Sequence, residues 1–156
     1  MMFLPEDKWS SRYEEQFYTI RMKGYVTIYS PSELPTSDLF NDDDNMVCSI
    51  FGLCNNSKKF PAVYYQIQVF RGPKSYIVLR RYSQFVTLCK KLDPCGTLQL
   101  KKSLPPKSHP LLFTEVPLTK RILGLYNFLN DILTRQECVN NVLIEQFLEL
   151  NREEET

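Results

Sequence analysis

The sequence predicts an α+β fold, in which a three-stranded antiparallel β-meander packs on a helical subdomain and an N-terminal extension precedes both. The β-prone runs are residues 46–54, 63–70 and 75–80, and the helical periodicities that follow them are 84–92, 118–133 and 139–150. Strands followed by helices are typical of α+β domains, and consecutive strands with short links pair antiparallel. With 156 residues, 43% of them hydrophobic and 24% charged, the chain has the size and balance of one soluble globular domain.

Residues 1–44 are expected to be an extension with a possible helix and an acidic loop. Four apolar residues recur at spacings of 4, 4 and 3, which favours an amphipathic helix over 8–22 that ends at Gly24. These four residues are Trp9, Tyr13, Phe17 and Ile20. A β-prone run over 25–29 stops at Pro31, and a polar loop follows. The extension could extend the sheet, cover an edge or carry a site for a protein partner.

Residues 45–151 are expected to form the main domain, and 152–156 an acidic tail. Apolar and polar residues alternate in the second half of 63–70, and the segment 71–74 (Arg-Gly-Pro-Lys) predicts a hairpin into the next strand. Ser83 is the expected N-cap of the helix over 84–92. In the helix over 118–133, a spacing of 3, 4 and 3 turns one face inward. That face consists of Ile122, Leu125, Leu129 and Ile132.

The five cysteines predict free thiols. Their number is odd and no C-x-x-C pair occurs, which argues against a disulfide framework or a zinc site. We therefore expect no metal and no cofactor. No apolar run approaches the roughly 20 residues that span a bilayer, so we expect a cytoplasmic protein.

The net charge of +1 conceals a strong segregation of charge along the chain. Residues 1–57 carry a net charge of −5, residues 58–121 carry +11, and residues 122–156 carry −5. A basic segment between acidic flanks indicates an anionic partner. Nucleic acid, an anionic membrane and a phosphorylated partner all fit, as does a merely solvated face, and composition alone does not choose among them.

Catalytic motifs are missing from the sequence. A Ser/His/Asp or Cys/His catalytic site would have to use the single histidine, His109. His109 precedes a proline in an expected loop, which argues against such a site. The sequence contains no phosphate-binding glycine loop, no G-x-S-x-G elbow and no H-E-x-x-H motif. We therefore expect a protein that is not an enzyme.

Three basic motifs follow one another at domain-compatible spacing. The first is R-R-Y-S-Q-F at 80–85, the second is L-P-P-K at 104–107, and the third is the pair Lys120-Arg121 early in a helix. In this order they resemble the Phox-homology (PX) domain of sorting nexins, and the resemblance covers roughly residues 45–151. Gln84 departs from the pattern, because an acidic residue is frequent there; we expect this to affect local pairing more than lipid choice.

The resemblance implies a pocket for phosphatidylinositol 3-phosphate on cytosolic membranes. It implies that Arg81 grips the 3-phosphate, that Tyr82 packs against the inositol ring and that Ser83 lies close to the same phosphate. Lys107 would meet the 1-phosphate, and Arg121 would hydrogen-bond the 4- and 5-hydroxyls. By the same resemblance the loop with Leu111, Leu112 and Phe113 enters the membrane interface, although these residues could instead fold back into the core.

Physical chemistry supports these roles. The planar fork of an arginine matches a phosphate or a vicinal diol with two parallel hydrogen bonds, and a helix N-terminus at Ser83 favours an anion. Neighbours on a strand point to opposite faces, so only one of Arg80 and Arg81 enters the pocket. The resemblance selects Arg81, which leaves Arg80 solvated or paired at the surface.

The sequence thus predicts a non-enzymatic phosphoinositide-binding domain. It would recruit the protein to endosomal membranes that contain phosphatidylinositol 3-phosphate, as a peripheral protein in membrane trafficking or protein sorting. One alternative is a PX-like module for protein contacts with weak or secondary lipid binding. A third reading is nucleic-acid binding through the basic segment; we expect no nucleic-acid partner.

Overall fold

The computed structural model describes residues 1–34, 61–106 and 115–152, although not the side chains of Pro31 and residues 115–117. Four strands form one sheet in the order β1-β2-β3-β4. They are β1 (Met2–Phe3), β2 (Phe17–Ile28), β3 (Ala62–Arg71) and β4 (Lys74–Arg81). The helices are α2 (Tyr82–Leu92), α3 (Glu115–Thr134) and α4 (Val142–Phe147), with short 3₁₀ turns η1 (Pro31–Glu33) and η2 (Leu100–Lys102).

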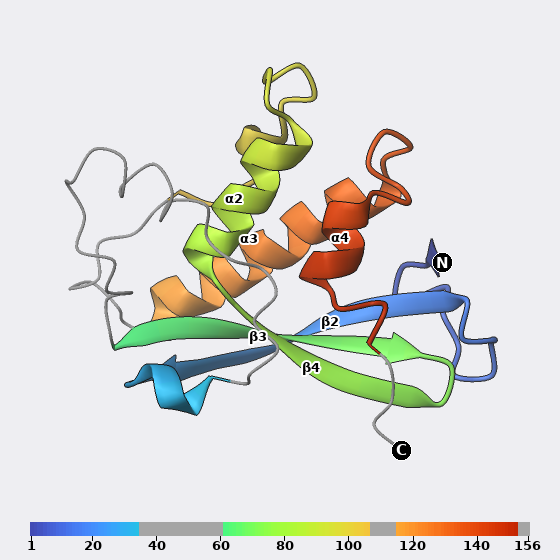
Figure 1. Cartoon of the computed structure of the whole chain (residues 1–156), viewed down its shortest axis with the longest axis horizontal. Helices are drawn as coiled ribbons and strands as arrows, with labels where there is room; N and C mark the ends of the chain where they lie inside the picture. Colours follow the sequence, from blue (N-terminus) through green and yellow to red (C-terminus); the bar gives the residue numbers. More distant parts are fainter. Residues whose placement is uncertain (35–60, 107–114, 153–156) are drawn as a thin grey trace.

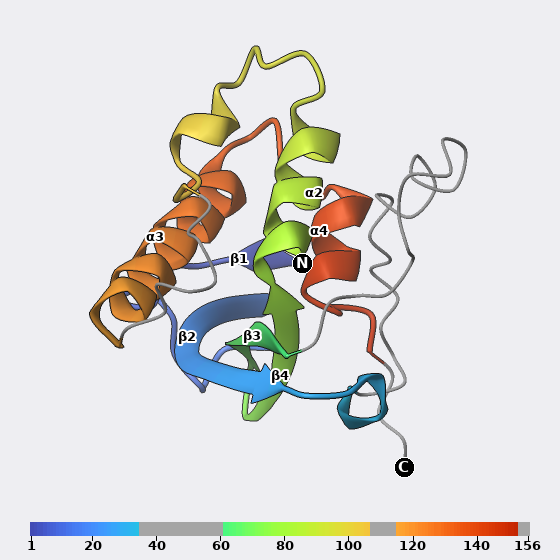
Figure 2. The same ribbon diagram turned by 90° about the vertical axis from the view of Figure 1, so that its left-hand side faces the viewer.

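The fold is α+β, with α2, α3 and α4 on one face of the sheet (Figures 1 and 2). The antiparallel meander consists of β2, β3 and β4, and β1 adds a short parallel pair at the edge of β2. Among the described residues, the sheet therefore has one strand more than the three predicted. The predicted strand over 46–54 lies outside the described residues.

The predicted helix over 8–22 is wrong, because residues 17–28 form the strand β2. Tyr18 and Ile20 belong to the core and alternate with Thr19, and all three are buried. Ten residues of β2 pair with β3, which gives this segment a main-chain partner that a local pattern cannot reveal. Trp9 directly follows a turn over residues 6–8, and its ring lies 5.6 Å from that of Phe70.

The link between β3 and β4 is the predicted hairpin. Its Gly72 has φ = 55°, in the left-handed region that favours glycine. A Cβ atom at this position would come within 3.2 Å of the Tyr13 carbonyl oxygen. The hairpin is therefore confirmed, and the N-terminal turn packs closely against it.

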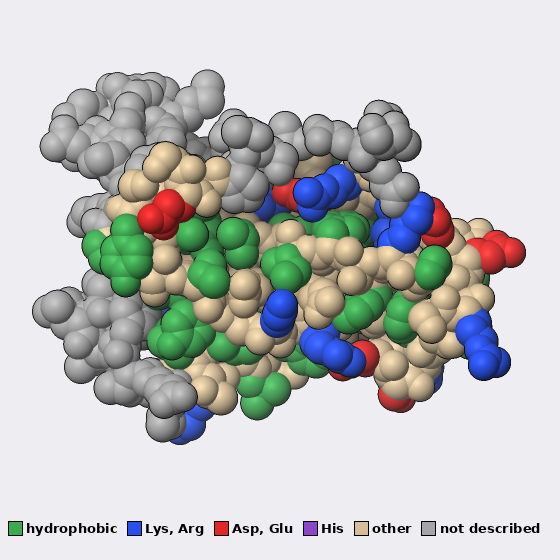
Figure 3. Space-filling view, turned by 90° about the horizontal axis from the view of Figure 1, so that it is seen from below, with side chains coloured by type: hydrophobic (Ala, Val, Ile, Leu, Met, Phe, Trp, Pro, Cys, Tyr) green, Lys and Arg blue, Asp and Glu red, His purple; other side chains and the backbone are tan. Residues whose placement is uncertain are grey.

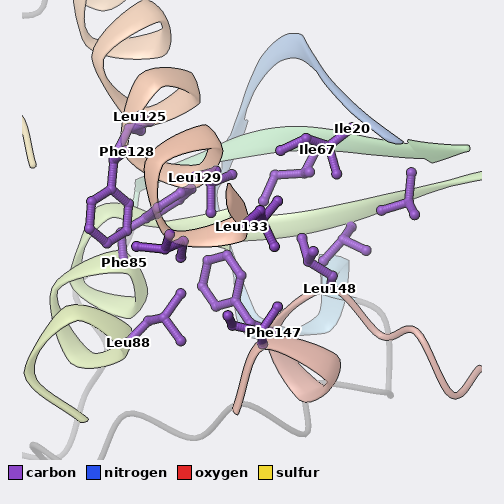
Figure 4. Close-up of a cluster of buried hydrophobic side chains, with 14 of the residues drawn as sticks. Ile20, Ile67, Phe85, Leu88, Leu125, Phe128, Leu129, Leu133, Phe147 and Leu148 are labelled. Atoms are coloured by element: carbon purple, nitrogen blue, oxygen red, sulfur yellow. The ribbon is translucent and has the colours of Figure 1, made fainter. Parts of the chain in front are cut away.

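The core lies between the sheet and the helices. Its largest fully buried members come from strands and helices alike, and Figure 4 shows Phe85, Phe128, Leu129 and Phe147 among them. The rings of Phe85 and Phe147 meet edge-on at 5.1 Å, which joins α2 to α4. The predicted inward face of α3 is confirmed, because Leu125, Leu129 and Ile132 are buried and Ile122 packs against the core.

The last predicted helix is shorter than expected. It was placed at 139–150, whereas α4 covers only Val142–Phe147 and turns precede and follow it. Asn141 caps its N-terminus, because its side-chain oxygen accepts a hydrogen bond from the Leu143 N–H at 2.9 Å. None of the described helices is long and apolar enough to cross a membrane.

Candidate functional site

The strand β4 ends in two arginines that point to opposite faces of the sheet. Arg80 pairs across the strands with Tyr65, and Arg81 with Tyr64. Arg80 is only 2% exposed, and its Nε atom donates to the Phe147 carbonyl oxygen at 3.0 Å. Arg81 is half-buried, with its guanidinium carbon 5.9 Å from the centre of the Tyr64 ring.

The prediction that Arg80 is solvated or paired at the surface is wrong. Its guanidinium also contacts the Gln146 carbonyl oxygen at 3.4 Å and a carboxylate oxygen of Glu149 at 3.5 Å. Because α4 packs over the end of β4, its last turn supplies carbonyl groups that need donors. Arg80 provides them, so its role is to hold α4 against the sheet.

Helix α2 starts without a linker where β4 ends (Figure 2). Arg81 is its N-cap, and the buried Gln84 side-chain oxygen accepts a hydrogen bond from the Arg81 N–H at 2.8 Å. The predicted N-cap, Ser83, is instead the second residue of the helix, and its carbonyl oxygen accepts a hydrogen bond from Thr87. The cap shifted because Gln84 reaches back to Arg81, which leaves Ser83 in the first turn.

Tyr82 connects this helix start to the segment that contains Pro105 and Pro106. Its hydroxyl donates a hydrogen bond to the Pro105 carbonyl oxygen at 2.6 Å. The carbonyl oxygen of Pro106 in turn lies 3.4 Å from Nη2 of Arg121. The first and third sequence motifs therefore meet at the proline segment of the second.

Arg121 is the seventh residue of α3 and is 7% exposed. Its guanidinium carbon lies 4.0 Å from the centre of the Tyr82 ring, a close cation–π contact. Tyr65 of β3 is 1% exposed. Burial raises the pKa of the Tyr65 hydroxyl, and the positive charge of Arg121 acts in the opposite direction.

Sequence reasoning did not foresee that the charge of Arg121 acts on the Tyr65 hydroxyl. The alternation in 63–70 was visible, but no local pattern links a strand residue to an arginine 56 positions later. Lys107 and the trio Leu111, Leu112 and Phe113 lie outside the described residues. Their predicted roles therefore stay predictions.

Four lysines of the central segment are exposed. Lys90 and Lys91 end α2, and Lys101 and Lys102 lie in η2. On the outer face of the sheet, hydrophobic and uncharged side chains separate the Lys and Arg side chains (Figure 3). In the described ranges, no group of three or more His, Cys, Asp and Glu side chains could hold a metal ion. The arrangement can supply aromatic rings and guanidinium N–H groups to an anionic or hydroxyl-rich ligand.

Comparison with known proteins identifies the family. A family model, described as the PX domain, matches residues 68–151. The match covers more than half of the chain, so the chain belongs to the PX-domain family. Among solved structures, the chain is similar to the X-ray structure of a designed CISK-PX domain, with 24% identity and a TM-score of 0.57, over 83% of this chain and 97% of the other. No curated protein sequence matches it.

The structural likeness supports the fold, and the family match supports a general function. PX domains are generally non-enzymatic modules that bind phosphoinositides in membranes, and the chain is such a module in this general sense. This membership also makes peripheral association with a membrane its general mode of action.

Proposed function

We propose that this PX domain binds phosphatidylinositol 3-phosphate and recruits the protein to endosomal membranes, as a cytoplasmic, sorting-nexin-like protein in trafficking or protein sorting. The observation that carries the proposal is the contact of Tyr82, Arg121 and the Pro105-Pro106 segment. The three come from different parts of the chain, and each belongs to one of the motifs on which the PX resemblance rests. Their convergence supports a single ligand site.

Each residue of the site has a proposed role. Arg81 grips the 3-phosphate beside the N-terminus of α2, whose N–H groups favour an anion, and Ser83 lies in the same first turn. Tyr82 packs against the inositol ring. Lys107, just beyond the described Pro106, meets the 1-phosphate.

Arg121 supplies the proposed selectivity. A guanidinium can hydrogen-bond two neighbouring hydroxyl groups with its two parallel N–H donors. A phosphate at position 4 or 5 would displace the hydroxyl that Arg121 binds, so the 3-monophosphate is preferred. The burial of Arg121 against the Tyr82 ring supports this role, because a fixed donor discriminates better than a mobile one.

Membrane attachment needs a second signal beside the headgroup, because headgroup contacts alone seldom hold a protein on a bilayer. We assign this signal to Leu111, Leu112 and Phe113, which enter the interface. The exposed lysines Lys90, Lys91, Lys101 and Lys102 add attraction to anionic lipid, on the order of 1 kcal/mol each near the surface. We also keep residues 1–44 as a possible site for a protein partner.

The test is co-sedimentation with vesicles that contain each of the seven phosphoinositides, with the wild-type chain beside Arg81→Ala. We expect binding confined to the 3-monophosphate and a loss of about 100-fold or more in the variant, since a charge-assisted bidentate contact disappears. Arg12→Ala, which removes an exposed arginine from the N-terminal turn, is the matched control and keeps its affinity.

Two other results would contradict the proposal. Equal binding to every anionic vesicle, unaffected by Arg81→Ala, would reduce the basic segment to a non-specific patch. No binding to any vesicle would favour the alternative, a PX-like module for protein contacts.

A further inference from the structure

The proline segment joins two side chains of the proposed lipid site. The Tyr82 hydroxyl donates a hydrogen bond to the Pro105 carbonyl oxygen at 2.6 Å. Nη2 of Arg121 lies 3.4 Å from the Pro106 carbonyl oxygen, and the sequence continues directly into Lys107. The place that this segment takes in the fold therefore bears directly on how the site is assembled.

The chain from 103 to 106 runs along helix α3, antiparallel to it. Ser103 Oγ donates a hydrogen bond to a carboxylate oxygen of Asp131 at 3.0 Å. Pro105 lies beside Gly124, about two turns nearer the start of the helix. The contact with Arg121 lies about one turn nearer still. Gly124 is thus the middle of three contacts that hold this stretch against α3.

Pro105 approaches Gly124 too closely for a side chain at that position. A Cβ atom on residue 124 would lie 3.1 Å from both Cβ and Cγ of Pro105 and 3.6 Å from its Cδ. Carbon atoms in favourable contact lie about 3.5–4.0 Å apart, so a single methyl group would push the proline ring away from α3. The ring is closed onto its own backbone nitrogen and cannot swing aside. The displacement would therefore reach the backbone of Pro105 and its carbonyl group.

The local structure gives no other reason for glycine at this position. Gly124 lies in the interior of α3, where alanine is the better helix former. It is not among the glycines with a positive φ, so it does not use the conformational freedom of glycine. Within the described residues, the three atoms nearest to a Cβ on residue 124 all belong to Pro105. The close approach of the proline ring is therefore what requires glycine here.

We propose that Gly124 is a positioning residue of the lipid site, a role that rests on the proposed function. Its bare backbone lets Pro105 lie directly against α3, which fixes the distance between the proline segment and the helix that carries Arg121. At this distance the segment holds the Tyr82 hydroxyl and contacts the Arg121 guanidinium, whose central carbon lies 4.0 Å from the Tyr82 ring. Side chains held in this way lose little further freedom when a ligand binds, which increases affinity.

The test compares Gly124→Ala with Asn127→Ala. Asn127 is exposed and lies about one turn later on α3, and alanine improves helix propensity at both positions, so the control matches the helix effect without the proline contact. Vesicles contain phosphatidylinositol 3-phosphate, at a temperature where circular dichroism shows every variant folded. We expect Gly124→Ala to lose about 5- to 10-fold in affinity, because the contacts of Tyr82 and Arg121 with the segment are weakened. Asn127→Ala stays within about twofold of wild type.

A double-mutant cycle shows whether Gly124 acts through the proline ring. Pro105→Gly removes the ring atoms that a methyl group on residue 124 would meet, but keeps the carbonyl group that accepts from Tyr82. In that background we expect Gly124→Ala to cause little further loss of affinity, because the steric conflict is absent. An equal loss in both backgrounds would overturn the positioning role, and so would wild-type affinity in Gly124→Ala.

Failure of the role of Gly124 is distinguishable from failure of the proposed function. A wild-type chain that binds no phosphoinositide vesicle would overturn both. Wild-type binding to the 3-monophosphate together with an unaffected Gly124→Ala would overturn only the role of Gly124.

Discussion

Arg80 and Arg121 are both buried, and each guanidinium lies over an aromatic ring and donates to a backbone carbonyl group. The ring is Phe147 at 5.5 Å for Arg80 and Tyr82 at 4.0 Å for Arg121. Arg80 is also the cross-strand partner of Tyr65. Their surroundings differ: Arg80 contacts the end of α4, and Arg121 contacts the proline segment that leads to Lys107. Burial of an arginine therefore does not mark a binding site; its neighbours do.

Arg80 belongs to a group that we term the C-terminal clamp, which comprises Arg71, Tyr76 and Arg80. Arg71 donates to the Leu150 carbonyl oxygen at 2.7 Å, and the other two bind carbonyl groups of residues 146–149. An isolated helix as short as α4 is unstable in water. The clamp supplies donors to its last carbonyl groups and so stabilises the helix through tertiary contacts.

The largest expected effect separates the two neighbouring arginines of β4. Arg80→Ala should lower the free energy of unfolding by about 3–5 kcal/mol, because the Glu149 carboxylate and several carbonyl groups lose a buried partner. Arg81→Ala should cost less than about 1 kcal/mol, since its side chain is half-buried over Tyr64. Urea denaturation measures both. A stable Arg80→Ala that has lost lipid affinity would mean that the two roles are exchanged.

High pH should weaken the clamp. Burial raises the pKa of Tyr76 to about 12, with Arg71 opposing the shift and Glu149 adding to it. Tyrosines of the unfolded chain release their protons near pH 10. The native state thus holds this proton more tightly, and the stabilisation, complete below pH 10, is lost as the pH rises from about 10 to 12. We expect a loss of about 2 kcal/mol, reduced by partial solvent screening.

Tyr76→Phe is the control for the pH effect. It cannot titrate at this position, so its stability should decline less over the same range, with a residual decline from Tyr18 and Tyr65, whose pKa values burial also raises. Urea denaturation at pH 9, 10 and 11 provides the comparison. Parallel declines in the two proteins would show that Tyr76 does not titrate as expected.

The smallest expected effect concerns the start of α2. Gln84→Ala removes the acceptor of the Arg81 N–H and should cost about 1 kcal/mol of stability, the usual cost of losing a cap. Because that cap holds the backbone of Arg81, lipid affinity should fall about two- to threefold as well. Gln146→Ala, on the exposed side of α4, is the matched control for both measurements. Unchanged affinity in Gln84→Ala would show that the cap does not position Arg81.

Local patterns predicted the elements whose partners are close in sequence. The hairpin at 71–74, the strands that flank it and the inward face of α3 are all present. The apolar spacing from Trp9 to Ile20 led to the wrong prediction of a helix over 8–22. Apolar residues at spacings of 3 and 4 can also occur where a turn is followed by a strand. The deciding contact was pairing with β3, more than 40 residues away in the chain.

By itself, the sequence determined the α+β class, the order of the basic motifs and, through the family match, a phosphoinositide-binding module. These follow from local periodicity and motif spacing, which any conformation of the chain preserves. Tertiary structure alone decided that Arg80 is buried under α4, that Arg81 caps α2 and that Arg121 lies over the Tyr82 ring. The physical reason is that a buried guanidinium must find acceptors in space, and those acceptors include residues 15 to 69 positions away in the chain.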